Sequence, residues 1–231
     1  ADAVKLMTKE DTIPAKADRF LFTLAPIVTV APALAALAVI PIAGAPFQVL
    51  GYQVQPWISD LNIGIVYLLA ISSLGIYGII LGGWSSNSKY SMLGALRSSA
   101  QMISYEVPLG FALIGVMMLA GSASTVSIVE AQRSSGWWYI LPQIVGFFCY
   151  FISAVAETNR VPFDLPEAES ELVAGFHPEY SGMKFALFFL AEYTNMIVVS
   201  SIVTVAFFGG WLRPFPNVEA LNWLENGWVF F

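Results

Sequence analysis

The sequence predicts an all-α protein, a polytopic bundle of about five membrane-spanning helices. Its composition is 57% hydrophobic and 11% charged, whereas a typical soluble domain is about 25% charged. The apolar residues form long runs of about 20, the length that crosses a bilayer as a helix. The basic residues also alternate along the chain in step with these runs, as in membrane proteins.

Five apolar stretches fit this length, and each is expected to be a spanning helix. They cover residues 20–42, 61–83, 99–120, 137–156 and 184–208. The first contains Pro26, Pro32 and Pro41. Proline in a span is tolerated where neighbouring helices or water satisfy the freed carbonyls. We therefore expect this helix to be kinked and buried in an assembly.

Lysine and arginine orient the predicted spans. Eight of the ten basic residues fall on one side, in the segment before the first span, in the connection 84–98, in the loop 157–183 and, as Lys184, at the end of that loop. The opposite side carries only Arg133 and Arg213. Basic residues mark the cytoplasmic side of short loops. The N-terminal segment is therefore predicted to face the cytoplasm or a mitochondrial matrix.

The composition also argues against several classes of function. A net charge of −6 provides no basic surface for nucleic acid. Cys149 is the only cysteine and His177 the only histidine. They do not make a set of ligands for an iron–sulfur cluster or a catalytic metal. We expect this chain to bind no metal and no cofactor of its own.

Acidic residues inside or at the edge of the predicted spans are candidates for a proton path. Glu106 and Glu192 lie within spans, and Glu157 closes the fourth. A carboxylate in the middle of a bilayer costs about 2.5–3.5 kcal/mol on insertion scales. Each acid is thus expected to face the bundle interior and to bind a partner or a proton. Neutral, hydrogen-bonded packing residues are the alternative, but three such acids favour a proton path.

The loop 157–183 holds six acids and one arginine. The acids are Glu157, Asp164, Glu167, Glu169, Glu171 and Glu179. Asp164 and Glu167 have the spacing of a capping box at a helix N-terminus, which accounts for one or two of them. The others repel one another, so a partner surface or proton handling explains them better. A merely solvated run of charge remains the alternative.

The two ends of the chain carry weaker signals. Residues 1–19 can form an amphipathic segment on the membrane surface, with Val4, Leu6 and Met7 toward lipid and Lys5 toward water; a plain linker fits equally well. Residues 212–231 are interpreted as an outer-side segment leading to a missing helix. Both ends are consistent with a piece of a longer chain.

Two long motifs bring a family resemblance. They are "SSNSKYSMLGALRSSAQMISYEVPLG" and "AETNRVPFDLPEAESELVAGFHPEYSGMKFALFFLAEYTN". With the opening segment and "FFGGW", they resemble the ND1 family, the H subunits of respiratory complex I, the proton-pumping NADH:quinone oxidoreductase. The likeness runs through nearly all of residues 1–211. It implies a membrane subunit that walls part of the quinone chamber. It implies eight helices in the whole family member, of which this chain carries five.

The resemblance assigns roles to individual residues. The loop facing the quinone chamber matches Arg160, Asp164, Glu167, Glu169 and Glu171. The proton path matches Glu106, Glu157 and Glu192, and the quinone entrance matches Lys5, Phe188 and Phe189. Quinone is then a substrate. Flavin and iron–sulfur clusters reside only in partner subunits, in the bacterial plasma membrane or the mitochondrial inner membrane.

Other functions stay open on the sequence alone. A stand-alone ion or solute carrier using Glu106 and Glu192 is one. The related membrane subunit of a membrane-bound hydrogenase is a second, and a structural membrane anchor for a soluble complex is a third. We found no internal repeat of the kind that many carriers possess.

Overall fold

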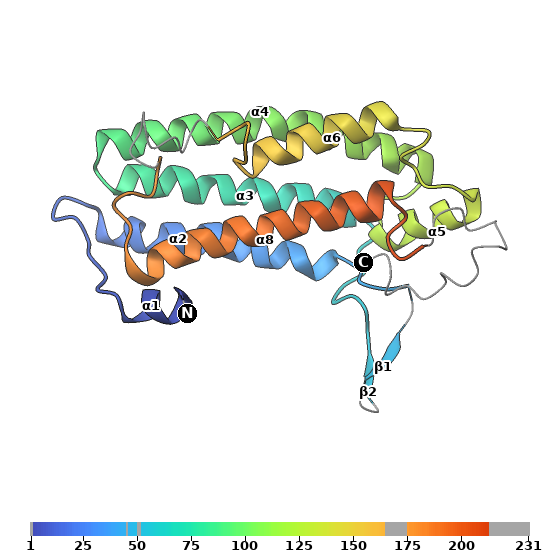
Figure 1. Cartoon of the computed structure of the whole chain (residues 1–231), viewed down its shortest axis with the longest axis horizontal. Helices are drawn as coiled ribbons and strands as arrows, with labels where there is room; N and C mark the ends of the chain where they lie inside the picture. Colours follow the sequence, from blue (N-terminus) through green and yellow to red (C-terminus); the bar gives the residue numbers. More distant parts are fainter. Residues whose placement is uncertain (1, 45, 50–51, 165–174, 213–231) are drawn as a thin grey trace. The chain divides into compact units, whose positions relative to one another are not determined.

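The computed structural model describes residues 2–44, 46–49, 52–164 and 175–212 (Figure 1). It divides into two compact units. Unit 1 comprises residues 1–35, 70–107 and 153–196, and unit 2 comprises 36–69, 108–152 and 197–231. The helices are α1 (Asp2–Thr8), α2 (Arg19–Ala36), the 3-10 turn η1 (Leu37–Val39), α3 (Gly64–Ser85), α4 (Lys89–Ala120), α5 (Thr125–Ser135), α6 (Ile144–Glu157) and α8 (Gly182–Phe207).

The predicted class is confirmed, because four described helices are long and apolar enough to cross a membrane. These are α2 with η1 (Arg19–Val39), α3, α4 and α8. The predicted fourth span is shorter than expected, since α6 has only 14 residues. Residues 137–143 are not helical, and 139–143 form turns. Pro142 explains part of this, because the residue before a proline is biased away from helical angles.

Other boundaries also differ from the prediction. α4 begins at Lys89, ten residues before the expected start, so most of the predicted connection 84–98 is helical. The predicted outer connection after α4 contains α5. Ser124 caps this helix, since its Oγ accepts from the amide of Ser127 at 3.3 Å, and Gly136 ends it in the left-handed conformation.

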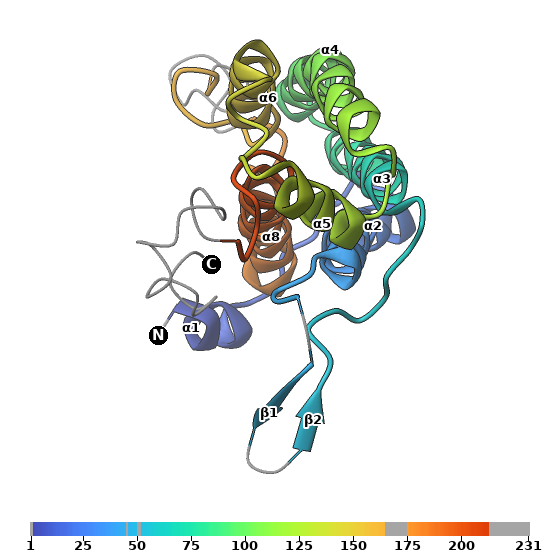
Figure 2. The same ribbon diagram turned by 90° about the vertical axis from the view of Figure 1, so that its right-hand side faces the viewer.

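A small β-hairpin in unit 2 was not predicted. Strands β1 (Phe47–Val49) and β2 (Tyr52–Val54) pair antiparallel, with Gln48 opposite Gln53. The hairpin projects from the helical part of its own unit in Figures 1 and 2.

Unit 2 also contains a fully buried glutamine, Gln132. Its Nε2 donates to the Val205 carbonyl at 2.9 Å, and its Oε1 accepts from the Tyr139 amide at 3.0 Å.

The core of unit 1 is aromatic. Phe22 of α2 stacks on Tyr180 with ring centroids 4.0 Å apart, and Phe188 of α8 meets the Tyr180 ring edge-on at 4.9 Å. Glycine permits close helix contact beside this core. A Cβ at Gly78 would lie 2.8 Å from the Thr29 backbone nitrogen, so α2 and α3 pack almost backbone to backbone here.

The N-terminal segment is seated on the beginning of α8. Lys184 forms an ion pair with Asp11 at 2.8 Å, and its ammonium lies 5.3 Å from the centre of the Phe22 ring. The Thr12 amide donates to the Ser181 hydroxyl at 2.9 Å. Both views show α1 beside the start of α8 (Figures 1 and 2). The contact between Thr12 and Ser181 joins residues 169 positions apart in the sequence.

Candidate functional site

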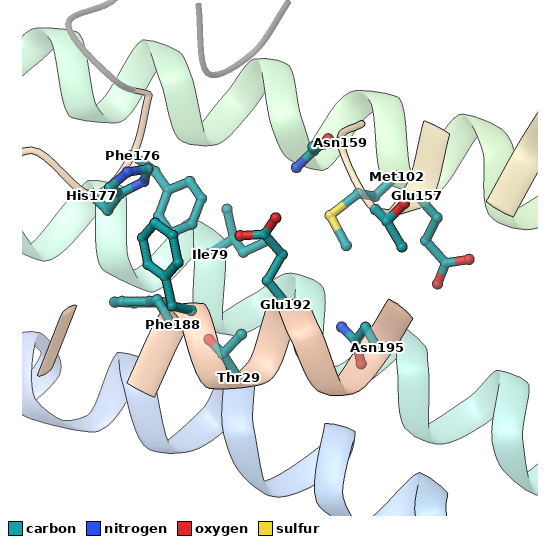
Figure 3. Close-up of a pocket in the computed structure, with 12 residues that line it drawn as sticks. Thr29, Ile79, Met102, Glu157, Asn159, Phe176, His177, Phe188, Glu192 and Asn195 are labelled. Carbon is teal, nitrogen blue, oxygen red and sulfur yellow. The ribbon is translucent and has the colours of Figure 1, made fainter. Parts of the chain in front are cut away.

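A mixed polar and apolar cavity lies within unit 1 (Figure 3). It has about 40 Å³ of space open to water, which is room for a few water molecules. Its polar lining comes from four segments: α2, the end of α6 with the residues after it, the segment 175–181, and α8. The lining residues used below are Glu157, Asn159, Phe176, His177, Phe188, Phe189, Glu192 and Asn195.

The cavity has a polar end and an aromatic end. In Figure 3, Phe176, His177 and Phe188 lie on one side, Glu157 and Asn195 lie on the other, and Glu192 stands between them. Carboxylates, an amide and hydroxyls can support a hydrogen-bonded chain of water, whereas aromatic rings cannot. The chemistry that this cavity supports is therefore proton exchange among its acids, at the polar end.

Glu192 in α8 is held by an ion pair. Its carboxylate lies 2.7 Å from the Arg160 guanidinium, and the same guanidinium stacks over the Tyr193 ring at 5.7 Å. Asp164 is close enough to Glu192 for their charges to repel. A change in charge at Asp164, in the loop, therefore acts on Glu192, in the helix, and on the ion pair that holds it.

Glu157 and Glu106 make a second acidic pair. Glu157 ends α6 and is half-buried, and its charge interacts with that of Glu106 in α4. Glu106 accepts a hydrogen bond from the Ser73 hydroxyl of α3. The two carboxylates therefore repel each other when both are charged. The three acids predicted for a proton path therefore all lie in the same unit, and two of them share the cavity.

Two titratable groups of the segment 175–181 are shifted by burial. Burial lowers the pKa of His177, whose ring packs against Phe176, Phe185 and Phe189. Burial also raises the pKa of Tyr180 to about 12, although its hydrogen bond with Ser85 acts in the opposite direction. Both groups are consequently neutral at pH 7.

The predicted loop residues are only partly within the described structure. Arg160 and Asp164 are described, and both act on Glu192. Glu167, Glu169 and Glu171 lie outside the described residues, as does the capping interaction expected between Asp164 and Glu167. The predicted roles of these three acids stay predictions.

The residues predicted for a quinone entrance do not form one cluster. Lys5 is exposed in α1. Phe188 and Phe189 both line the cavity, Phe188 packing against Phe176 and Tyr180 and Phe189 against His177, and neither is in contact with Lys5 in the interactions described. Their role in quinone entrance is not tested by this arrangement and stays a prediction.

Two amide side chains that hold the site were not predicted. Asn159 lines the cavity with a backbone φ of 48°, and Gln101 donates hydrogen bonds to the chain around it. Asparagine adopts this left-handed conformation more readily than most residues. Both side chains are uncharged amides, and the motifs that contain them were interpreted through their charged residues. Apart from this, the sequence gave no indication that they hold the site.

Metal binding has no candidate among the residues that the structure describes, because no three His, Cys, Asp or Glu side chains come together there. The absence of a resident cofactor stays a prediction. Four helices long and apolar enough to span a membrane, with half-buried acids lining a cavity in unit 1, define a multi-pass helical membrane protein with an ionisable site.

Comparison with known proteins identifies the family. The family model described as NADH dehydrogenase matches residues 1–231, and the chain belongs to this family. It is 55% identical to the H subunit of the NADH-quinone oxidoreductase of Magnetococcus marinus over 98% of the chain and 62% of that protein. It is 52% identical to the corresponding H 2 subunit of Rhizobium meliloti over 100% of the chain and 70% of that protein. It is 54% identical to the H subunit of Rhodospirillum centenum over 98% of the chain and 63% of that protein. The chain thus spans about two thirds of the length of these relatives.

Proposed function

We propose that this chain is a membrane subunit of a proton-translocating NADH:quinone oxidoreductase, and that it couples quinone reduction to proton movement. Family membership supports the assignment to the complex. The observation that carries the coupling role is the convergence of Glu106, Glu157, Glu192 and Arg160 in one unit. Quinone is the proposed substrate, and the loop 157–183 borders its chamber.

The chain's own contribution is to hold and move protons. Quinone reduction takes up protons and changes the charge beside the loop. Arg160 responds because it is paired with Glu192, which also feels the charge of Asp164. When the ion pair between Arg160 and Glu192 weakens, Glu192 exchanges a proton with Glu157 through water in the cavity. Repulsion between Glu157 and Glu106 then favours uptake of this proton by Glu157.

Electron chemistry belongs to partner subunits in this proposal. Flavin and iron–sulfur clusters supply electrons from NADH in those partners, and neighbouring membrane subunits continue the proton path. The proposed location is the bacterial plasma membrane or the mitochondrial inner membrane. The named relatives are bacterial proteins, which supports the bacterial plasma membrane for this chain.

The test replaces the two cavity acids in the assembled complex. Glu157→Gln and Glu192→Gln keep the shape of the side chain but cannot exchange a proton. We expect NADH:quinone turnover to fall at least tenfold. Removal of a proton-transfer group typically costs roughly 10²–10⁴-fold in rate. Assembly, followed as flavin content and complex size, should remain unchanged.

The matched control is Glu130→Gln. Glu130 is an exposed acid of α5 that pairs with Arg133, one turn away on the same helix. Its replacement should leave turnover and protons moved per electron unchanged. Normal turnover and normal stoichiometry in both cavity variants would reduce the acids to packing residues. Proton conduction by the purified chain alone in liposomes would instead favour the carrier interpretation.

A further inference from the structure

Gln101 of α4 makes an unusual set of contacts with the chain that follows α6. Its Nε2 lies 2.9 Å from the Ala156 carbonyl, 3.1 Å from Asn159 Oδ1 and 2.9 Å from the Phe163 carbonyl. All three partners are acceptors, so the NH₂ group of the amide faces them and shares its two hydrogens among the three. One side chain therefore ties together the first, middle and last parts of the segment 156–163.

Asn159 extends this set of contacts to a second residue of α4. Its Nδ2 donates to the Ser98 hydroxyl at 3.1 Å, while its Oδ1 accepts from Gln101. Asn159 is 8% exposed and has a φ of 48°. A buried asparagine in this conformation, with both ends of its amide bonded to α4, cannot shift without breaking hydrogen bonds. The Tyr105 ring also meets the Phe163 ring edge-on at 5.3 Å.

Arg160 sits in the middle of the segment that is held in this way. Its amide donates to the Val155 carbonyl at 3.2 Å, and its carbonyl accepts from the Phe163 amide at 2.7 Å. The Arg160 backbone is thus fixed by contacts on both sides of it. Its guanidinium then reaches Glu192 of α8.

We propose that Gln101 is a positioning residue, which sets the place of Arg160 opposite Glu192 by anchoring residues 156–163 to α4. Its side chain is uncharged, binds no proton and acts only through the segment it holds. The inference deepens the proposed function and rests on it, because the ion pair matters for turnover only if Glu192 belongs to the proton path. A purely structural role for Gln101 is the competing explanation.

The first measurement is independent of activity. Gln101→Met keeps the length and helix propensity of the side chain but removes every donor. In the assembled complex, we expect hydrogen–deuterium exchange of the amides of residues 158–163 to become at least tenfold faster. Gln132→Met is the matched control, since it removes a buried glutamine that bonds backbone groups of unit 2. It should leave exchange at 158–163 unchanged.

The second measurement is a double-mutant cycle on NADH:quinone turnover. Gln101→Met should lower turnover about tenfold, because small misplacements of a charged group cost up to about 10²-fold. In an Arg160→Ala background the same change should cost less than twofold, because the group it positions is gone. Gln132→Met should cost the same factor with and without Arg160.

Each outcome bears on a separate claim. Unchanged exchange at residues 158–163 in Gln101→Met would overturn the anchoring. Suppose that exchange becomes faster, but Gln101→Met lowers turnover by the same factor with and without Arg160→Ala. The link through the ion pair would then be overturned. If Arg160→Ala itself turns over normally, the proposed function of the pair fails, while the exchange result still decides whether Gln101 anchors the segment.

Discussion

Gly94 in α4 is a position where one added methyl group should disturb the backbone packing of unit 1 directly. A Cβ there would lie 2.5 Å from the carbonyl carbon of Gly175, 2.7 Å from its oxygen and 2.8 Å from its Cα. Favourable carbon contacts are about 3.5–4.0 Å. All three neighbours are backbone atoms, so no side-chain rotation relieves the clash. Gly94→Ala must push α4 and Gly175 apart by about 1 Å, the difference between these contacts and a favourable one.

The expected cost follows from two opposing terms. Overpacking of a well-packed site costs about 1–3 kcal/mol, whereas alanine in place of glycine within a helix returns up to about 1 kcal/mol. Because all three neighbours are backbone atoms, we take the upper part of the overpacking range, about 2–3 kcal/mol, and the full helix gain of about 1 kcal/mol, which leaves a net loss of about 1–2 kcal/mol. For a chain of this size, about 2–4 °C of Tm corresponds to 1 kcal/mol. We therefore expect Tm to fall by about 2–8 °C.

Gly75→Ala in α3 is the matched control. Its Cβ would meet nothing within 4 Å, so only the gain in helix propensity acts and Tm should rise. The measurement is thermal unfolding of both variants in the same detergent, followed by tryptophan fluorescence. A Tm for Gly94→Ala at or above that of the parent chain would refute the reasoning. Because Gly175 directly precedes Phe176 and His177, the same variant should also lower turnover.

Two further predictions concern charged groups at the edge of unit 1. Lys184→Met removes a nearly buried ammonium that pairs with the half-exposed Asp11. We expect the free energy of unfolding to fall by about 1 kcal/mol and proteolysis of residues 9–18 to become faster. Lys89→Met, at an exposed position, is the control and should change neither quantity. Because burial lowers the pKa of His177, the unfolded chain binds more protons than the folded chain as pH falls below about 6.5. Stability should fall in that direction, and His177→Gln should flatten the slope of Tm against pH. Equal slopes for the two proteins would contradict the assignment.

Much of the helical architecture was predictable, because long apolar runs have few alternatives in a membrane. The errors arose where hydropathy stops being informative. The first turns of α4 are amphiphilic and therefore resembled a connection, although nothing between Lys89 and Ser98 breaks a helix. In the expected fourth span, the apolar run 137–143 includes Pro142 and is not helical. The α5 helix and the hairpin are too short and too mixed in polarity to stand out.

The candidate site was predictable only as far as charge revealed it. Glu106, Glu157 and Glu192 stood out because a buried carboxylate is costly, and the structure places all three in one unit. Gln101 and Asn159 carry no charge, and amides of this kind are common in any helix or loop. Their importance depends on which backbone groups they meet, and the contacts of Gln101 join residues 55 to 62 positions apart in sequence.

The seating of the N-terminal segment on α8 has a consequence for biogenesis. Thr12 bonds Ser181, 169 residues later in the chain, and Asp11 pairs with Lys184. At synthesis rates of about 5–20 residues per second, the first segment exists for roughly 8–34 s before its partners are made. Throughout that interval the N-terminal segment lies near the ribosome and the membrane-insertion machinery without its native contacts to α8. Its closure onto α8 is therefore among the last steps in the assembly of unit 1, and α8 must be inserted before the N-terminal segment reaches its final place.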